Sequence, residues 1–173
     1  YSDEYKGEKV PGLREVLELA QGKIKLNIEL KPADNGEELA RKTVALIEKY
    51  NMENDCVITS FSSSALSAAK SCDENIRVGY ILSAAYGDYY DMKNIDFFSV
   101  NAAFLSKRTI DAIHNSGKQV YAWTVNNKDS IKNLTNKGVD GVITDNPVLA
   151  RETIYSRDTS ETIVNMIRYV FNQ

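Results

Sequence analysis

The feature that most limits how this chain can fold is a repeated alternation of short strand patterns and amphipathic helix patterns. Strand patterns cover residues 23–31, 56–60, 77–82, 97–101, 119–125 and 141–144. Helix patterns cover residues 12–20, 34–50, 62–69, 106–116 and 128–137, and another helix begins at Pro147. Short strands that alternate with helices pair in parallel through right-handed crossovers. The alternation therefore predicts an α/β fold with about six parallel strands.

Two α/β architectures fit this order of elements: an open doubly wound sheet and a (β/α)8 barrel, of which about six strands would be an incomplete set. Nucleotide-binding domains of the doubly wound class carry a glycine-rich loop after a strand. Neither GxGxxG nor GxxxxGK[ST] follows any of the strand patterns. The missing glycines weaken the nucleotide-binding interpretation, but the pattern alone does not separate the two architectures.

Composition and charge exclude some classes of protein. The chain has 173 residues, of which 43% are hydrophobic and 26% charged, as in a globular domain. Its net charge of −3 is spread over intermixed acids and bases, so we expect no nucleic-acid partner. The longest apolar runs are far shorter than the roughly 20 residues of a transmembrane helix. The compartment stays open, cytoplasmic or extracytoplasmic, because two cysteines do not fix it.

The two cysteines and the one histidine do not form a metal motif. Cys56 and Cys72 have a spacing that matches no CxxC pattern, and His114 cannot complete a zinc site with them. We expect two buried thiols. His114 falls in the middle of a predicted helix, where we expect it to pack or to face the surface.

The strand pattern at residues 23–31 carries the first candidate site. Its alternation puts aliphatic side chains on one face and Asn27, Glu29 and Lys31 on the other, which in a barrel points inward. A carboxylate in a poorly solvated interior needs a cation. Glu29 and Lys31 would stand on the same side about 6 to 7 Å apart, with room for a metal ion and a phosphate between them. The alternative is an edge strand with a solvated polar face.

Other polar or aromatic residues follow the later strand patterns. In a (β/α)8 barrel the working groups stand at the carboxyl ends of the strands. The residues at these ends are Ser60, Asn101, Trp123 with Asn126, and Asp145. We expect Asp145 to cap the helix that begins at Pro147, because an acidic residue at a helix start is a common structural device.

Several of these segments resemble the glycerophosphodiester phosphodiesterase family. KIKLNIELK is similar to the family's "LNIELK" strand, and VPGLREVLEL before it resembles the "IPTLEEVLEL" helix. VITSFSSSAL resembles the family's "SF" strand end, GKQVYAWTVN its "WTVN" strand, and GVDGVITDNP its final strand and turn. The resemblance runs from about Val10 to Arg151 and implies a TIM barrel of the (β/α)8 type.

The resemblance also implies roles for single residues. Glu29 would be a ligand of a divalent metal, Mg²⁺ or Ca²⁺, and Lys31 would hold the phosphate. Phe61 and Trp123 would form walls for the glycerol end of the substrate. Asn101 and Asn126 would be polar contacts to the substrate.

The sequence departs from the family in one important respect. Family members carry a His-Arg-Gly strand end, a Glu-x-Asp metal pair and a His-Asp pair, and none of these is in the sequence. We therefore expect no catalytic residue within the chain, and we expect the histidine pair upstream of Tyr1. The parent enzyme would be a hydrolase that cleaves glycerophosphodiesters to glycerol 3-phosphate and an alcohol, and the chain alone would be inactive or nearly so.

The organisation expected from the resemblance is a barrel over residues 1–155 that lacks its first two strands. An extra amphipathic helix within residues 156–173 would dock on it. Two absent strands would leave unpaired edges, which proteins normally cover, so we expect pairing with a second copy or with an N-terminal segment of the protein. The alternative function is a non-catalytic barrel remnant that binds a ligand or partner. A phospholipase-type phosphodiesterase acting on lipid head groups ranks last, because no basic or apolar rim is evident.

Overall fold

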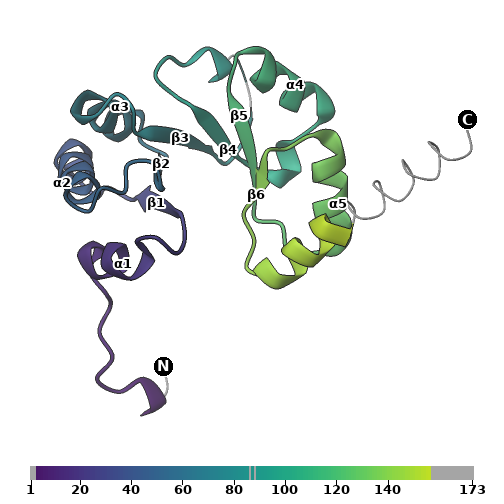
Figure 1. Ribbon diagram of the computed structural model, residues 1–173. Helices are drawn as coiled ribbons and strands as arrows, with labels where there is room; N and C mark the ends of the chain where they lie inside the picture. The colour runs from purple at the N-terminus through teal and green to yellow at the C-terminus, as the bar shows by residue number, and fades with distance from the viewer. Residues whose placement is uncertain (1–2, 86, 88, 157–173) are drawn as a thin grey trace, which may run out of the picture. The chain divides into compact units, whose positions relative to one another are not determined.

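The computed structural model describes residues 3–85, 87 and 89–156, in which short strands and helices alternate along the chain (Figure 1). The chain consists of two compact units, and the boundary between them follows Tyr80, within β3. The first unit contains η1 (Asp3–Tyr5), α1 (Leu13–Ala20), β1 (Leu26–Leu30), α2 (Gly36–Lys49), β2 (Cys56–Ser60), α3 (Ser63–Cys72) and the start of β3 (Arg77–Leu82). The second contains η2 (Tyr89–Asp91), β4 (Phe97–Asn101), η3 (Ala102–Phe104), α4 (Lys107–Asn115), β5 (Gln119–Trp123), α5 (Lys128–Lys137), β6 (Gly141–Val142) and a helix at residues 147–156.

In the first unit, β1 pairs with β2 and β2 with β3, all in parallel. The register places Ile28 beside Ile58 and Leu30 beside Ser60. On this face Leu30 and Ile58 are buried, and α2 and α3 lie side by side and pack against the strands (Figure 1). Because side chains alternate along a strand, Asn27 and Glu29 stand on the opposite face. The structure therefore has Asn27 and Glu29 on the strand face that the sequence pattern predicts for them.

In the second unit, β4 pairs with β5 and β5 with β6, again in parallel. One face of β4 and β5 is fully buried and consists of Phe98, Val100, Val120 and Ala122. The other face carries Ser99, which is buried, and Asn101, Tyr121 and Trp123, which are partly exposed. Burial of one face and partial exposure of the other is the arrangement that places functional groups at strand ends.

Helix starts follow capping chemistry, with one difference from the expected boundaries. Ser62 and Ser106 cap α3 and α4, because each hydroxyl accepts a hydrogen bond from a backbone N–H three residues later. The cap of α2 is Asn35, whose Oδ1 accepts from the Glu38 N–H at 3.1 Å. The cap therefore lies one residue after Asp34, where the helix pattern of the sequence begins.

The cysteines differ in burial, so the expectation of two buried thiols is wrong for one of them. Cys56, at the start of β2, is buried, whereas Cys72, the last residue of α3, is exposed. Burial and, to a smaller extent, the nearby Asp55 and Glu53 carboxylates raise the pKa of the Cys56 thiol to about 11.

We expect a thiol reagent at about pH 8 to modify one cysteine of the folded chain rapidly. The reactive group is the exposed Cys72, because reaction requires an accessible thiolate and the Cys56 pKa of about 11 keeps that thiol protonated. The raised pKa also makes the stability of the fold depend on pH. The neutral Cys56 thiol stabilises the fold below its ordinary pKa, and this contribution is lost as the pH rises toward 11.

The measurement is the number of thiols that react with a chromogenic disulfide before and after denaturation. Cys72→Ser is the control, and it should leave no rapid reaction in the folded chain. Two rapid thiols in the wild-type chain would contradict the burial of Cys56.

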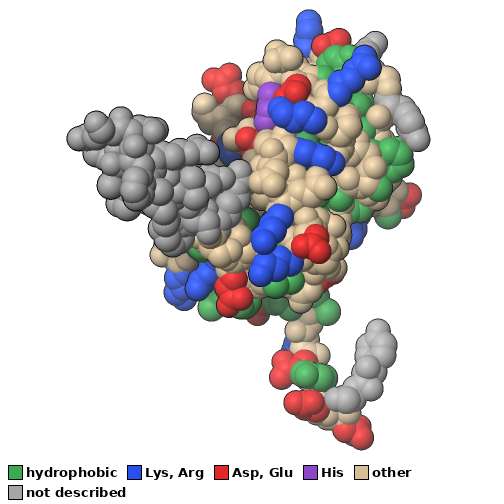
Figure 2. Space-filling model, turned by 90° about the vertical axis from the view of Figure 1, so that its right-hand side faces the viewer, with side chains coloured by type: hydrophobic (Ala, Val, Ile, Leu, Met, Phe, Trp, Pro, Cys, Tyr) green, Lys and Arg blue, Asp and Glu red, His purple; other side chains and the backbone are tan. Residues whose placement is uncertain are grey.

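The described surface carries charges of both signs. On the face drawn in Figure 2, lysine and arginine side chains (blue) are interspersed with acidic ones (red). Within residues 3–85, 87 and 89–156, the helices are too short or too polar to cross a membrane. Apart from residue 156, the amphipathic helix expected within residues 156–173, and with it the expected docking of that helix, lies outside the described residues.

Candidate active site

An acid and a base stand at the carboxyl end of β1. Glu29 is the fourth residue of the strand and Lys31 follows its last residue, so both point to the same side. Lys31 Nζ lies 3.6 Å from Glu29 Oε2, and the side chains are 77% and 35% exposed, respectively. The expectation of an open gap of about 6 to 7 Å between the groups is wrong, because the long side chains lean toward each other. An ion pair this exposed contributes little to stability.

Polar side chains tie β1 to β2 at this end of the strands. The Thr59 hydroxyl donates to Asn27 Oδ1 at 2.9 Å, and the buried Ser60 hydroxyl donates to the Leu30 carbonyl at 2.8 Å. Ser60 Oγ also accepts from the Ser62 N–H at 3.0 Å. The side chain of Asn27 before Glu29 and the carbonyl of Leu30 after it are thus held by bonds other than the strand ladder. From the sequence alone Ser60 is only a polar residue at a strand end, because its partner lies thirty residues away.

Phe61 directly follows β2 and is the aromatic residue of this unit that stands at a carboxyl strand end. Its side chain is 48% exposed, whereas Ser60 before it is fully buried. Because Ser60 pairs with Leu30, Phe61 stands at the same strand ends as Lys31.

In the second unit, Trp123 ends β5 beside Asn101, which ends β4. The indole Nε1 of Trp123 donates to the Ser99 carbonyl at 2.9 Å, and this bond lays the half-buried ring across the two strands. Asn101 Oδ1 accepts from the Ala103 N–H at 3.0 Å and thereby caps the short helix η3. The oxygen of Asn101 is therefore used within the protein.

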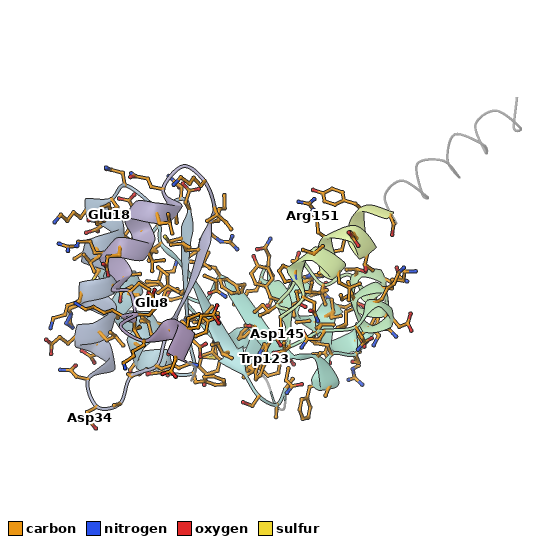
Figure 3. The ribbon with its side chains drawn as sticks, turned by 90° about the horizontal axis from the view of Figure 1, so that it is seen from below. Glu8, Glu18, Asp34, Trp123, Asp145 and Arg151 are labelled. Carbon is orange, nitrogen blue, oxygen red and sulfur yellow. The ribbon has the colours of Figure 1, made fainter. Side chains whose placement is uncertain are left out.

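Asn126 and Asp145 meet where the chain leaves β5 and β6. Asn126 Nδ2 donates to Asp145 Oδ2 at 2.7 Å, and Asn126 Oδ1 accepts from the Asp145 N–H at 2.9 Å. Figure 3 labels Asp145 together with Trp123 in this unit. The residue before the helix at 147–156 is Asn146, whose carbonyl accepts from the Ala150 N–H. The expectation that Asp145 caps this helix is therefore wrong: Asn146 holds the cap position and Asp145 binds Asn126.

His114 lies at the opposite ends of the strands. Its Nε2 is 2.9 Å from Asp140 Oδ2, and the same oxygen accepts from the Val120 N–H at 2.8 Å (the histidine is purple in Figure 2). Val120 is near the start of β5, and Asp140 directly precedes β6. Because barrel chemistry belongs to the carboxyl ends of strands, this cluster has a stabilising role. The expectation that His114 packs or faces the surface agrees with this geometry, in which the residue is exposed and bonded to Asp140.

Comparison with known proteins supplies the family. Residues 1–149 match the sequence profile of the glycerophosphoryl diester phosphodiesterase family, which is most of the chain. The chain belongs to this family.

Curated relatives support the membership at moderate identity. A glycerophosphodiester phosphodiesterase of Caldanaerobacter subterraneus subsp. tengcongensis is 26% identical over 97% of this chain and 66% of its own length. A probable glycerophosphodiester phosphodiesterase of Mycobacterium tuberculosis is 29% identical over 87% of this chain and 62% of its own length. The chain therefore spans less than two thirds of the length of these phosphodiesterases.

Solved structures of similar proteins agree in fold. An Oleispira antarctica phosphodiesterase, solved in complex with the product sn-glycerol-3-phosphate, is 27% identical with a TM-score of 0.73, covering 87% of this chain and 64% of its own. A glycerophosphodiester phosphodiesterase from Parabacteroides distasonis is 22% identical with a TM-score of 0.80, covering 88% of this chain and 67% of its own. The expected α/β fold of the (β/α)8 type, with six parallel strands of an incomplete barrel, is confirmed.

Enzymes of the glycerophosphoryl diester phosphodiesterase family generally depend on a divalent metal. A hard cation of this kind takes several oxygen ligands. No cluster of three or more His, Cys, Asp or Glu side chains occurs in the part of the chain that the structure describes. Glu29 offers one carboxylate, with the Lys31 ammonium beside it. The described residues thus do not form a complete metal site by themselves.

Proposed function

We propose that the protein carrying this chain hydrolyses glycerophosphodiesters to glycerol 3-phosphate and an alcohol. The observation that carries the proposal is the Glu29–Lys31 pair at the carboxyl end of β1, on the strand face turned away from α2 and α3. A cationic group and a carboxylate side by side suit a phosphate that is bound together with a cation. Membership of the phosphodiesterase family, and a relative solved with sn-glycerol-3-phosphate, support the same substrate class.

Each residue has a proposed role. Lys31 binds the phosphate, and Glu29 is one ligand of the divalent cation, Mg²⁺ or Ca²⁺, whose other ligands are outside the described residues. Phe61 and Trp123 pack against the glycerol end. Asn101 contacts the substrate through its amide nitrogen, because its oxygen caps η3.

Replacing Lys31 with alanine is expected to weaken binding of sn-glycerol 3-phosphate about tenfold. A hydrogen bond to a charged group contributes about 1.5–3 kcal/mol, and each 1.4 kcal/mol is a factor of ten in affinity. The measurement is a titration of the purified chain with sn-glycerol 3-phosphate at low ionic strength, followed by NMR chemical shifts. Glu29→Gln should leave this metal-free affinity unchanged or raise it, and should abolish any gain from added Mg²⁺ or Ca²⁺.

Lys25→Ala is the matched control for this experiment. Lys25 is an 80% exposed lysine on the residue before β1, at the other end of the strand, 4.0 Å from Asp55. Its replacement removes the same charge from the chain without touching the carboxyl end. Equal losses of affinity for the two lysine variants would mean that net charge, and not a site at Lys31, attracts the phosphate.

The outer edge of β1 is a possible site for pairing with another strand. Among the described residues, β1 pairs with β2 alone and so ends its row of strands. We propose that a strand from a second copy, or from a segment outside the described residues, covers this edge. Light scattering of the purified chain tests the first option.

A further inference from the structure

We infer that Asn126 is a positioning residue that closes the carboxyl ends of β5 and β6 and so holds Trp123 in place for the substrate; this role rests on the proposed function. The inference replaces the expectation that Asn126 contacts the substrate. It stands on hydrogen bonds within the second unit alone.

The backbone ladder between β5 and β6 continues past the residues assigned to the strands. The Ile143 N–H donates to the Ala122 carbonyl at 2.8 Å, and the Val125 N–H donates to the Ile143 carbonyl at 2.9 Å. These bonds tie residues 122–125 to residue 143. The next residue on the first segment is Asn126, which therefore stands where the ladder ends.

Beyond the end of the backbone ladder, the side chain of Asn126 forms the hydrogen bonds that join the two segments. Its Oδ1 accepts from the Thr144 hydroxyl at 3.1 Å and from the Asp145 N–H at 2.9 Å, and its Nδ2 donates to Asp145 Oδ2 at 2.7 Å. The Thr144 hydroxyl also accepts from the Asn146 N–H at 3.0 Å, and Asn146 Nδ2 reaches the Asn126 carbonyl at 3.4 Å. Asn126 thus bonds the three consecutive residues 144–146, Thr144 and Asp145 through its side-chain amide and Asn146 through its backbone carbonyl.

The chemistry of these partners fixes the orientation of the amide. A backbone N–H can only donate and a carboxylate can only accept, so the amide oxygen must face Asp145 N and the amide nitrogen must face Asp145 Oδ2. Reversing the amide would place a donor against a donor and an acceptor against an acceptor. A side chain with both functions on a short stem suits this position, and asparagine meets the requirement.

Trp123 is the group that this clamp positions. Its indole is held on one side by the bond to the Ser99 carbonyl, and its backbone lies three residues before Asn126 on the segment that the clamp fixes. Figure 3 shows Trp123 and Asp145, the two ends of this arrangement, in the same unit. A pocket wall is useful only if its ring is held in one orientation, because ordering it on binding costs conformational entropy.

The test uses the purified chain of 173 residues, in which Trp123 is the one tryptophan and so the sole source of indole fluorescence. Asn126→Ala is expected to shift the emission to longer wavelength and to increase quenching by acrylamide, while far-ultraviolet circular dichroism is unchanged. It should also weaken binding of sn-glycerol 3-phosphate about fivefold, the order of one net hydrogen bond. Asn133→Ala, the same change at an exposed position of α5, is the matched control and should alter neither reading.

A pair of exchanged variants keeps the test decisive even if the alanine variant does not fold. Asn126→Asp sets two carboxylates against each other and should show the full fluorescence change. Adding Asp145→Asn restores an amide opposite a carboxylate, with the same donors and acceptors in exchanged places, and should return the emission and quenching toward wild type. The inference is overturned if Asn126→Ala leaves Trp123 emission and quenching unchanged, or if the double variant is no closer to wild type than Asn126→Asp alone.

The fluorescence result and the binding result answer separate questions. If Asn126→Ala alters Trp123 fluorescence but the wild-type chain does not bind sn-glycerol 3-phosphate, the role of Asn126 in positioning Trp123 stands and the proposed function of the chain is rejected. Unaltered fluorescence in a chain that binds sn-glycerol 3-phosphate would reject the clamp and keep the proposed function.

Discussion

The purified chain is expected to hydrolyse glycerophosphodiesters at least about 10⁴-fold more slowly than a family member that carries the catalytic histidine pair, because a general acid and a general base each contribute about 10²–10⁴ to the rate. The sequence holds a single histidine, His114. That imidazole is bonded to Asp140 at the amino ends of β5 and β6, whereas Trp123, in the same unit, stands at the carboxyl end of β5. It is therefore in the wrong place to serve as the missing acid or base.

The measurement is release of glycerol 3-phosphate from glycerophosphocholine, with Mg²⁺ or Ca²⁺ and with a chelator. The product-binding Oleispira antarctica phosphodiesterase is a suitable positive control. Turnover by the chain that needs the metal, scales with chain concentration and disappears in Glu29→Gln would contradict the expectation. Binding of sn-glycerol 3-phosphate without turnover would favour the binding-module alternative for the chain alone.

The strands were predictable because their signals are local. β2, β3 and β4 have the bounds expected from their β-branched and aromatic runs between turn residues. The strand pattern at residues 119–125 extends two residues past β5. The Val125 N–H still donates to the Ile143 carbonyl, so the pattern agrees with the extent of the backbone hydrogen bonds. Local periodicity is enough for such elements.

The differences arise where neighbouring residues compete or where an element ends. Asp34 and Asn35 are both residue types that cap helices well, and in the structure Asn35 is the one that bonds the Glu38 N–H. Cys72 shares the helical face of the buried Ala69, but it is the last residue of α3 and lies exposed. A periodic pattern gives the face of a residue but not where its packing neighbours end.

The candidate site shows the same division. The parity of Glu29 follows from alternation along one strand, so the sequence was sufficient for it. The clamp of Asn126 and Asp145 joins residues nineteen apart in sequence, and no local period connects them. Sequence reasoning therefore assigned Asn126 to a ligand and Asp145 to a helix cap, although each is the partner of the other.

Replacing Phe97 with alanine is expected to lower the free energy of unfolding of the second unit by about 3–5 kcal/mol, the range for buried phenylalanines. Phe97 is 0% exposed, and its ring centroid lies 4.7 Å from that of Tyr121. The side chain belongs to the same strand face as Ser99, whose carbonyl holds Trp123. Its loss leaves a cavity on the face that carries the proposed pocket wall, and the strands around it relax only in part.

The measurement is urea denaturation followed by Trp123 fluorescence, which reports on the unit that contains Phe97. Val148→Ala is the control, because Val148 is 69% exposed in the same unit and surface changes of this kind are usually within about 0.5 kcal/mol. The loss expected for Phe97→Ala corresponds to a change of about 10²–10⁴ in the unfolding equilibrium constant, since 1.4 kcal/mol is a factor of ten. The prediction is contradicted if the urea midpoint for Phe97→Ala falls no further than that for Val148→Ala. The strand face that carries Trp123 would then not be packed tightly enough to hold the ring in place for glycerol.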